Sequence, residues 1–182
     1  MYSGKMNYHD YLQIDKLLDA QKLESDVRGQ HAHDEMLFIV VHQVYELWFK
    51  LILTELESVL TIFQQDHIDE RLMDKIVGRL QRVVEIQKLL IDQVGIIETM
   101  TPLDFLEFRD MLIPASGFQS LQFRTIETRL GLKREQRLKY NQADFDQSLK
   151  PEQRAPIGAL EAQPSLFDCV DRWLARTPFL KM

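Results

Sequence analysis

Hydrophobic residues recur every three or four positions along most of this chain, a spacing that places them on one side of an α-helix. The longest such pattern begins after Asp34, a residue type suited to a helix N-cap, and continues to about Gln65 without proline or glycine. A second pattern runs from about Ile68 to Glu98. The chain therefore predicts two long helices that are antiparallel neighbours, preceded by a polar loop over Glu24 to His33.

Shorter helical patterns follow, separated by proline and glycine. Thr101-Pro102-Leu103-Asp104 predicts a helix start, because Thr can cap, Pro suits the first helical position, and an acid can meet free backbone N–H groups. Pro114 should end that helix. Two further helices are expected over about Phe118 to Leu130 and Ser165 to Arg176, with a mostly irregular connection over about residues 132–164.

The absence of strand-like alternation, with only Gly 7 and Pro 6, favours an all-α fold in which shorter helices surround a bundle of long ones. We expect a single helical domain over residues 1–182. Its N-terminal arm, about residues 1–12, carries Tyr8, Tyr11 and Leu12 and has little to bury by itself. The arm is expected either to cap the core of its own subunit or to reach a neighbouring subunit.

Composition and charge exclude several classes of protein. A hydrophobic share of 45% with 27% charged residues is typical of a globular protein, and a net charge of −6 disfavours a general nucleic-acid binder. The lone cysteine, Cys169, cannot form an internal disulfide, which suits a reducing compartment. We find neither a signal-peptide pattern nor a continuous run of about 18 apolar residues that could span a bilayer. These features predict a cytoplasmic protein without nucleic-acid or membrane partners.

His42 is the odd residue in the largely apolar segment Phe38 to Lys50. It shares one helical stripe with three aromatic residues, Phe38, Tyr45 and Phe49. Such a histidine is either a buried polar group with a dedicated partner, which is the commoner case, or the polar contact of a pocket.

Arg109 lies four residues after Phe105, so a guanidinium and an aromatic ring share a helix face. Alone, Arg109 is more often a salt-bridge partner than a carboxylate clamp. If its helix faces that of His42, the two could bind an amphipathic molecule with an acid and an aromatic N–H, between walls of Phe38 and Phe105. The small residues Ala115-Ser116-Gly117 indicate either a sharp turn or a close approach to a ligand.

Four separated segments resemble tryptophan 2,3-dioxygenases, in the order and spacing of that family: Tyr8–Leu12, His33–Lys50, Glu98–Arg109 and Ser116–Arg124. The resemblance extends through Trp173–Pro178. It implies an all-helical homotetramer that depends on haem b with ferrous iron. With molecular oxygen as co-substrate, such an enzyme cleaves the indole ring of L-tryptophan to N-formyl-L-kynurenine, the first step of tryptophan degradation by the kynurenine pathway.

The resemblance also implies roles for individual residues near the substrate. His42 would be the catalytic residue that hydrogen-bonds the indole N–H, and Phe38 would pack against the indole and the oxygen side of the haem. Arg109 would hold the substrate carboxylate. Phe105 stands where some relatives have Tyr and others Phe.

Further residues would complete the pocket. By the same resemblance, Ser116 and Gly117 would lie at the haem edge. Tyr8, Tyr11 and Leu12 would come from the neighbouring subunit and close the indole pocket.

The chain departs from the family pattern at its end. Family members are considerably longer, and their proximal haem histidine and a Gly-rich substrate loop lie beyond the point where this sequence stops. No histidine here lies in a segment that matches the proximal motif, so no metal ligand is expected among His9, His31, His33, His42 and His67. We expect a C-terminally truncated dioxygenase domain. The alternative is a non-catalytic helical module that binds tryptophan without ligated haem.

Overall fold

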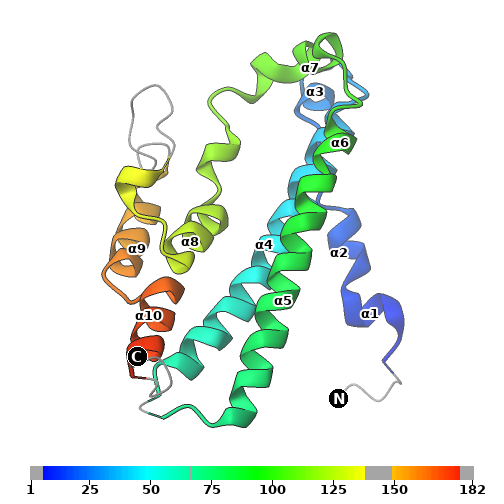
Figure 1. The fold of residues 1–182 in the computed structure, drawn as a ribbon. Coiled ribbons are helices and arrows are strands. Elements are labelled where there is room, and N and C mark those ends of the chain that lie inside the picture. Colours follow the sequence, from blue (N-terminus) through cyan, green and yellow to red (C-terminus); the bar gives the residue numbers. More distant parts are fainter. Residues whose placement is uncertain (1–5, 66, 138–148, 177–182) are drawn as a thin grey trace. The chain divides into compact units, whose positions relative to one another are not determined.

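The computed structural model describes residues 6–65, 67–137 and 149–176, and within these ranges the chain forms helices and turns without a strand (Figure 1). The prediction of an all-α fold is confirmed. The α-helices are α1 (Tyr8–Leu12), α2 (Ile14–Leu18), α3 (Glu24–Val27), α4 (Glu35–Phe63), α5 (Glu70–Asp92), α6 (Val94–Ile97), α7 (Pro102–Arg109), α8 (Leu121–Leu130), α9 (Pro151–Glu161) and α10 (Leu166–Arg176). Short 3₁₀ turns are η1 (Asp110–Leu112), η2 (Gly117–Gln119) and η3 (Arg134–Gln136).

The chain forms two compact units, each with more contacts within itself than with the other. Unit 1 comprises Met1–Gln43 and Gly95–Ile113, and unit 2 comprises Val44–Val94 and Pro114–Met182. Helix α4 begins in unit 1 and continues into unit 2. The single domain expected over residues 1–182 stays a prediction, and each unit is described by itself below.

The two long helices run side by side in unit 2 (Figure 1), and most buried residues of its core lie on them, as their apolar spacing predicts. One cluster joins buried residues of α4, α5 and α8: Ile52, Leu56, Val83, Ile86, Leu90 and Ile126. A second joins α4, α5 and α10: Val59, Leu60, Ile62, Phe63, Ile76 and Cys169. Burying each large aliphatic side chain contributes about 1.5–3 kcal/mol, so these clusters are the main source of cohesion in unit 2.

The ends of the long helices differ slightly from the prediction. Helix α4 begins at Glu35, directly after Asp34 as expected. Helix α5 begins after Asp69, whose carboxylate accepts a hydrogen bond from the Arg71 N–H at 2.9 Å. It ends at Asp92 rather than continuing to Glu98, and the short α6 follows after Gln93.

Helix α8 is bounded by local signals. The predicted start at Phe118 is wrong, because Ser120 caps the helix by accepting a hydrogen bond from the Phe123 N–H at 3.1 Å. Gly131 ends α8 as predicted, with φ of +105°. A Cβ at Gly131 would lie 2.8 Å from Oγ of Ser165, so glycine also permits close packing against the start of α10.

The connection expected to be irregular over residues 132–164 contains a helix, so that prediction is wrong in part. Helix α9 starts with Pro151 at its first position and holds Pro156 inside it. The prolines indicated a break, but burial of Ile157 against Leu121, Leu149 and Leu160 favours the helix. Residues 138–148 lie outside the described residues.

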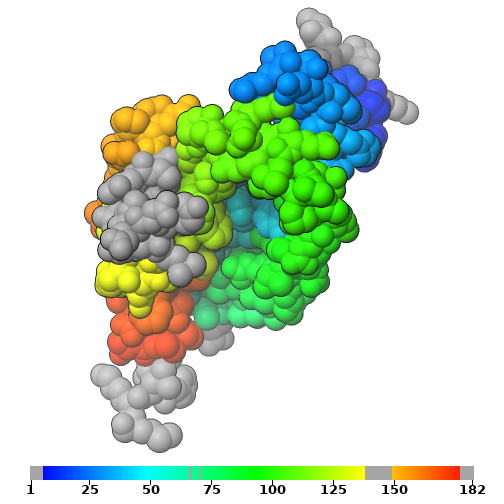
Figure 2. Space-filling view, turned by 90° about the horizontal axis from the view of Figure 1, so that it is seen from above, coloured from blue at the N-terminus to red at the C-terminus, as the bar shows by residue number. Residues whose placement is uncertain are grey.

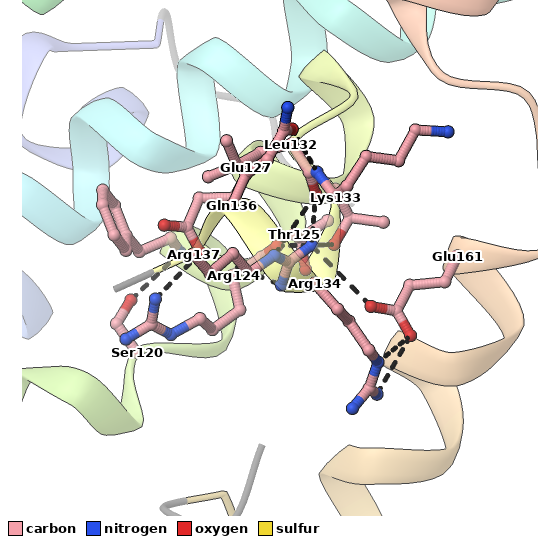
Figure 3. A network of polar contacts seen from close by, with 12 residues as sticks. Ser120, Arg124, Thr125, Glu127, Leu132, Lys133, Arg134, Gln136, Arg137 and Glu161 are labelled. Atoms are coloured by element: carbon pink, nitrogen blue, oxygen red, sulfur yellow. Dashed lines mark hydrogen bonds and ion pairs between the residues drawn. The ribbon is translucent and has the colours of Figure 1, made fainter. Parts of the chain in front are cut away.

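The buried Arg137 fastens the chain after α8 to that helix (Figure 3). The Arg137 guanidinium donates to Oγ1 of Thr128 at 2.8 Å and to the carbonyl of Leu132 at 3.1 Å. Burial lowers the pKa of Arg137, and the carboxylates of Glu127 and Glu161 oppose that effect. Figure 2 shows the yellow-green, orange and red segments of α8, α9 and α10 packed together, in agreement with the contacts of α8 with α9 and with α10.

By length and composition alone, α4 is apolar enough to cross a membrane. The segment holds no unbroken run of about 18 apolar residues, because polar residues such as Glu46 and Lys50 interrupt it. Core helices of globular proteins meet the same criterion, and the second half of α4 contributes buried residues to both clusters of unit 2. Hydropathy therefore gives only weak evidence for a membrane segment here.

The polar stretch Glu24 to His33 is not wholly a loop as expected. It opens with one helical turn, α3, and Ser25 and Ala32 within it are buried. This segment belongs to unit 1, as do the first turns of α4 and the whole of α7.

Candidate functional site

Two helices of unit 1 carry the residues singled out as substrate contacts. The start of α4 holds Phe38 and His42, and α7 holds Phe105 and Arg109. Helix α7 begins as the sequence predicts. Thr101 and Asp104 exchange capping hydrogen bonds, and those from Thr101 lower the pKa of the Asp104 carboxyl.

Aromatic rings join α4 to α7. The ring of Phe38 lies 5.7 Å from that of Phe105 and 5.6 Å from that of Phe108, centroid to centroid. Phe105 and Phe108 pack edge to face at 5.5 Å. Such distances are typical of favourable aromatic pairs, so the three rings form one aromatic cluster that holds the two helices together.

His42 lies at the edge of this aromatic cluster. Its ring is 4.1 Å from that of Phe38, and its Nδ1 lies 2.7 Å from the Phe38 backbone carbonyl oxygen, one helical turn earlier. A carbonyl oxygen can only accept, so Nδ1 must carry the proton. In the neutral imidazole, Nε2 is therefore an acceptor, and the side chain of His42 is exposed rather than buried in the core.

Arg109 lies next to Phe105 of the aromatic cluster. Its guanidinium carbon is 6.0 Å from the centre of the Phe105 ring, and the residue is half-buried. Within residues 6–65, 67–137 and 149–176, the Arg109 side chain has neither an ion pair nor a hydrogen bond. The commoner role of salt-bridge partner is therefore not observed there, and its N–H donors face no described carboxylate.

The other predicted substrate contacts lie on the N-terminal arm. Tyr8 and Tyr11 of α1 are 72% and 70% exposed, and Leu12 is also exposed. Neither α1 nor α2 contains a buried residue. The described helices of the arm therefore bury no side chain against the core of their own chain, which disfavours the first of the two expectations for the arm.

Ser116 and Gly117, predicted at a haem edge, belong to unit 2. Ser116 caps η2 by accepting a hydrogen bond from the Phe118 N–H at 3.3 Å, and both Ser116 and Gly117 are exposed. The cap accounts for Ser116, whereas Gly117 has neither a positive φ nor a described atom within 4 Å of an added Cβ, so the local geometry does not require glycine there. Their place beside a cofactor stays a prediction.

The aromatic stripe of α4 continues into unit 2 with different partners. The Tyr45 hydroxyl donates to the Leu90 carbonyl of α5 at 2.6 Å, and burial raises the pKa of Tyr45. Phe49 packs 5.5 Å from Phe123 of α8. These two residues of the stripe hold helices together in unit 2, whereas Phe38 and His42 present their rings within unit 1.

Phe108 is the site residue that the sequence analysis did not single out. It is 0% exposed and touches both Phe38 and Phe105. Its position three residues after Phe105, on a helix with a clear start, could have indicated a second ring on the same face. The described part of the chain contains no group of three or more His, Cys, Asp or Glu residues that could hold a metal ion.

The fold and the site define an all-helical protein in which an aromatic cluster on two helices is flanked by an imidazole acceptor and a guanidinium. Comparison with known proteins is more specific. A family model described as tryptophan 2,3-dioxygenase matches residues 1–182. The chain therefore belongs to the tryptophan 2,3-dioxygenase family.

Curated relatives agree with this assignment. The chain is 56% identical to a tryptophan 2,3-dioxygenase of Bdellovibrio bacteriovorus over 97% of its own length and 49% of the relative's. It is 54% identical to one of Alteromonas mediterranea, over 96% and 48% of the two lengths. It is 50% identical to one of Xenopus laevis, over 98% and 44%. The chain thus spans about half the length of the curated relatives it matches.

Proposed function

We propose that this chain supplies the tryptophan-binding side of a haem-dependent dioxygenase that converts L-tryptophan to N-formyl-L-kynurenine, the first step of the kynurenine pathway. One observation carries the proposal. The Nδ1–H of His42 is engaged with the Phe38 carbonyl at 2.7 Å, which leaves Nε2 as an acceptor beside an aromatic cluster. An indole N–H is a donor on an aromatic ring and matches that arrangement.

His42 positions the substrate in this proposal. Its Nε2 accepts a hydrogen bond from the indole N–H, while the ring of Phe38 packs on the indole face. The hydrogen bond from Nδ1 to the Phe38 carbonyl fixes both the tautomer and the direction of the ring. A substrate held in one orientation reacts at one bond of the indole, so His42 contributes through positioning.

Arg109 and Phe105 bind the other end of the substrate. The guanidinium offers a planar fork that fits a carboxylate, and no described residue occupies it. Phe105 lacks the hydroxyl that a tyrosine would bring, so it supplies an apolar wall and the guanidinium alone supplies the charge. The proposed substrate is therefore L-tryptophan, which carries the carboxylate, and not an indole that lacks one.

The group implied by the family is haem b with ferrous iron, which supplies activation of molecular oxygen when bound. The residues present fit one face of such a group, because the exposed imidazole of His42 and the ring of Phe38 would place a polar group on an apolar surface. Ser116 and Gly117 are proposed at the haem edge. No residue of this chain is proposed as the axial ligand of the iron.

The exposed arm suggests how the pocket is closed. Tyr8, Tyr11 and Leu12 leave apolar surface uncovered on helices without a buried residue. We propose that they cover the indole pocket of a neighbouring subunit in a cytoplasmic homotetramer. Covering the indole would exclude water from the reacting bond.

The test is product formation by the purified protein supplied with haem, a reductant, oxygen and L-tryptophan. The proposal predicts N-formyl-L-kynurenine, identified by mass, and a large loss of it in Arg109→Ala. Arg71→Ala is the matched control, because Arg71 lies on α5 with a side chain 91% exposed. Absence of both product and tryptophan binding in the unmodified protein would contradict the proposal.

A further inference from the structure

Glu35, the first residue of α4, is a buried acid outside the set of proposed substrate contacts. It is only 1% exposed, and both of its carboxylate oxygens are used. Oε1 accepts from the Glu24 N–H at 2.7 Å, and Oε2 accepts from the Ser25 N–H at 2.9 Å. A carboxylate that accepts two backbone N–H groups forms strong, directional hydrogen bonds, so Glu35 fixes the start of α3 to the start of α4.

The segment held by Glu35 is also closed by hydrogen bonds of its own. Ser25 is fully buried, and its hydroxyl accepts a hydrogen bond from the buried Ala32 N–H at 3.2 Å. The Glu35 N–H in turn donates to the Ala32 carbonyl at 3.3 Å. Residues 24–35 therefore close into a compact loop whose two ends meet at Glu35.

This loop also contacts η1, the turn that follows the helix carrying Arg109. The Glu24 carboxylate pairs with Nε of Arg28 at 2.9 Å, and Nη2 of Arg28 donates to the Met111 carbonyl at 3.1 Å. Met111 lies in η1, which continues directly from the end of α7 at Arg109. One chain of polar contacts thus runs from Glu35 through Glu24 and Arg28 to the backbone next to Arg109.

We infer that Glu35 is a positioning residue for the substrate site, acting through Glu24 and Arg28 to hold Arg109 at a fixed place relative to Phe38 and His42. The inference rests on the proposed function, because it concerns the grip of Arg109 on a substrate carboxylate. Aromatic packing alone allows rings to slide and tilt, since pairs are favourable over a range of geometries. The directional hydrogen bonds of residues 24–35 restrict this sliding and tilting at the start of α4 and at the end of α7.

The test compares the dissociation constants of L-tryptophan and tryptamine, which differ only in the carboxylate. The dissociation constant of tryptamine divided by that of L-tryptophan measures how much the carboxylate adds to binding. A variant that only lowers the folded fraction weakens both ligands by the same factor, so the ratio does not change. A purely structural role for Glu35 would therefore lower thermal stability and leave the ratio as it was.

Glu35→Gln keeps the size of the side chain but replaces one acceptor oxygen by an NH₂ group that faces a backbone donor. We expect the ratio to shrink at least about threefold, well short of the about 10²-fold that a 1 Å misplacement can cost. Glu55→Gln is the matched control. Glu55 is a buried glutamate of the same helix, but its partners Arg79 and Arg82 lie on α5, so the ratio should not change.

Two further variants keep the inference open to refutation. Arg28→Ala, at a half-exposed side chain, should fold even if Glu35→Gln does not, and should shrink the ratio about twofold. In an Arg109→Ala background, Glu35→Gln should change the ratio no further, because both changes act on one contact. Unequal loss of the two ligands in that background would overturn the route through Arg109.

The outcomes separate the inference from the proposed function. If the unmodified protein binds tryptophan no more tightly than tryptamine, the proposed carboxylate clamp is wrong, and the inference is wrong with it. If the unmodified protein prefers tryptophan but Glu35→Gln and Arg28→Ala keep that preference, only the positioning role is overturned.

Discussion

Phe108 is the residue whose removal should damage the proposed site most without touching a ligand. It is 0% exposed on α7 and packs its ring against Phe38 at 5.6 Å and against Phe105 at 5.5 Å. Phe108→Ala should lower stability by about 3–5 kcal/mol, the usual cost of emptying a buried aromatic position. Part of this is the loss of two ring pairs, each worth about 0.5–1.5 kcal/mol.

Amide hydrogen exchange shows which helices lose stability in Phe108→Ala. Since each 1.4 kcal/mol is about tenfold in an equilibrium, amides of α7 and the first turns of α4 should exchange about a hundredfold faster or more. Tryptophan fluorescence supplies an internal comparison, because Trp48 and Trp173 both belong to unit 2. The fluorescence of these two tryptophans should change little, while the amides of α7 exchange faster.

Leu106→Ala is the matched control for Phe108→Ala. Leu106 lies on the same helix but is 62% exposed, so its truncation should change stability by about 0.5 kcal/mol or less. Equal effects of the two substitutions on α7 exchange would refute the view that the aromatic cluster holds α7 to α4. An effect of Phe108→Ala below about 1 kcal/mol would refute it as well.

Four other predictions follow from particular contacts. His42→Leu removes the acceptor of the indole N–H and should slow product formation about ten- to hundredfold, measured by turnover at saturating tryptophan. Arg109→Ala should raise the tryptophan concentration needed for half-maximal rate while changing the rate with carboxylate-free indoles little; equal losses for both substrates would remove Arg109 from the site. Gly131→Ala should lower the thermal midpoint, because φ is +105° and its Cβ would lie 2.8 Å from Oγ of Ser165. Ser165→Ala removes the hydroxyl hydrogen bond that contributes most to the lowered pKa of Asp168, while the bond from the Ser165 backbone N–H remains, so it should cost about 0.5–2 kcal/mol near neutral pH; because a depressed carboxyl pKa stabilises above the unfolded value of about 3.9, the difference between variant and parent should fade as pH falls below that value.

Local signals explain which parts of the fold could be predicted from the sequence. The start of α7 depends on Thr101 and Asp104, three residues apart, and the end of α8 depends on Gly131, so both could be placed without tertiary information. Helix α9 could not, because Pro156 argues against a helix locally. Burial of Ile157 against Leu121 of α8, together with Leu149 and Leu160, favours the helix despite Pro156.

The same distinction applies to the candidate site. The tautomer of His42 depends on a carbonyl one turn earlier, so it follows once the helix is known. That Arg109 faces no described carboxylate depends on every neighbouring element, and no sequence pattern reports it. The role of Glu35 was also out of reach, because its partners Glu24 and Ser25 lie eleven and ten residues away.

The central claim is that His42 offers an unprotonated Nε2 to the indole N–H of L-tryptophan. The most direct measurement is the ¹⁵N chemical shift of the His42 ring nitrogens, assigned by comparison with His42→Leu, before and after addition of L-tryptophan. We predict that Nδ1 is protonated throughout and that the Nε2 resonance moves on binding, but not with a tryptophan methylated at the indole nitrogen. A protonated Nε2 in the neutral ring, or a resonance that tryptophan leaves unchanged, would contradict the claim.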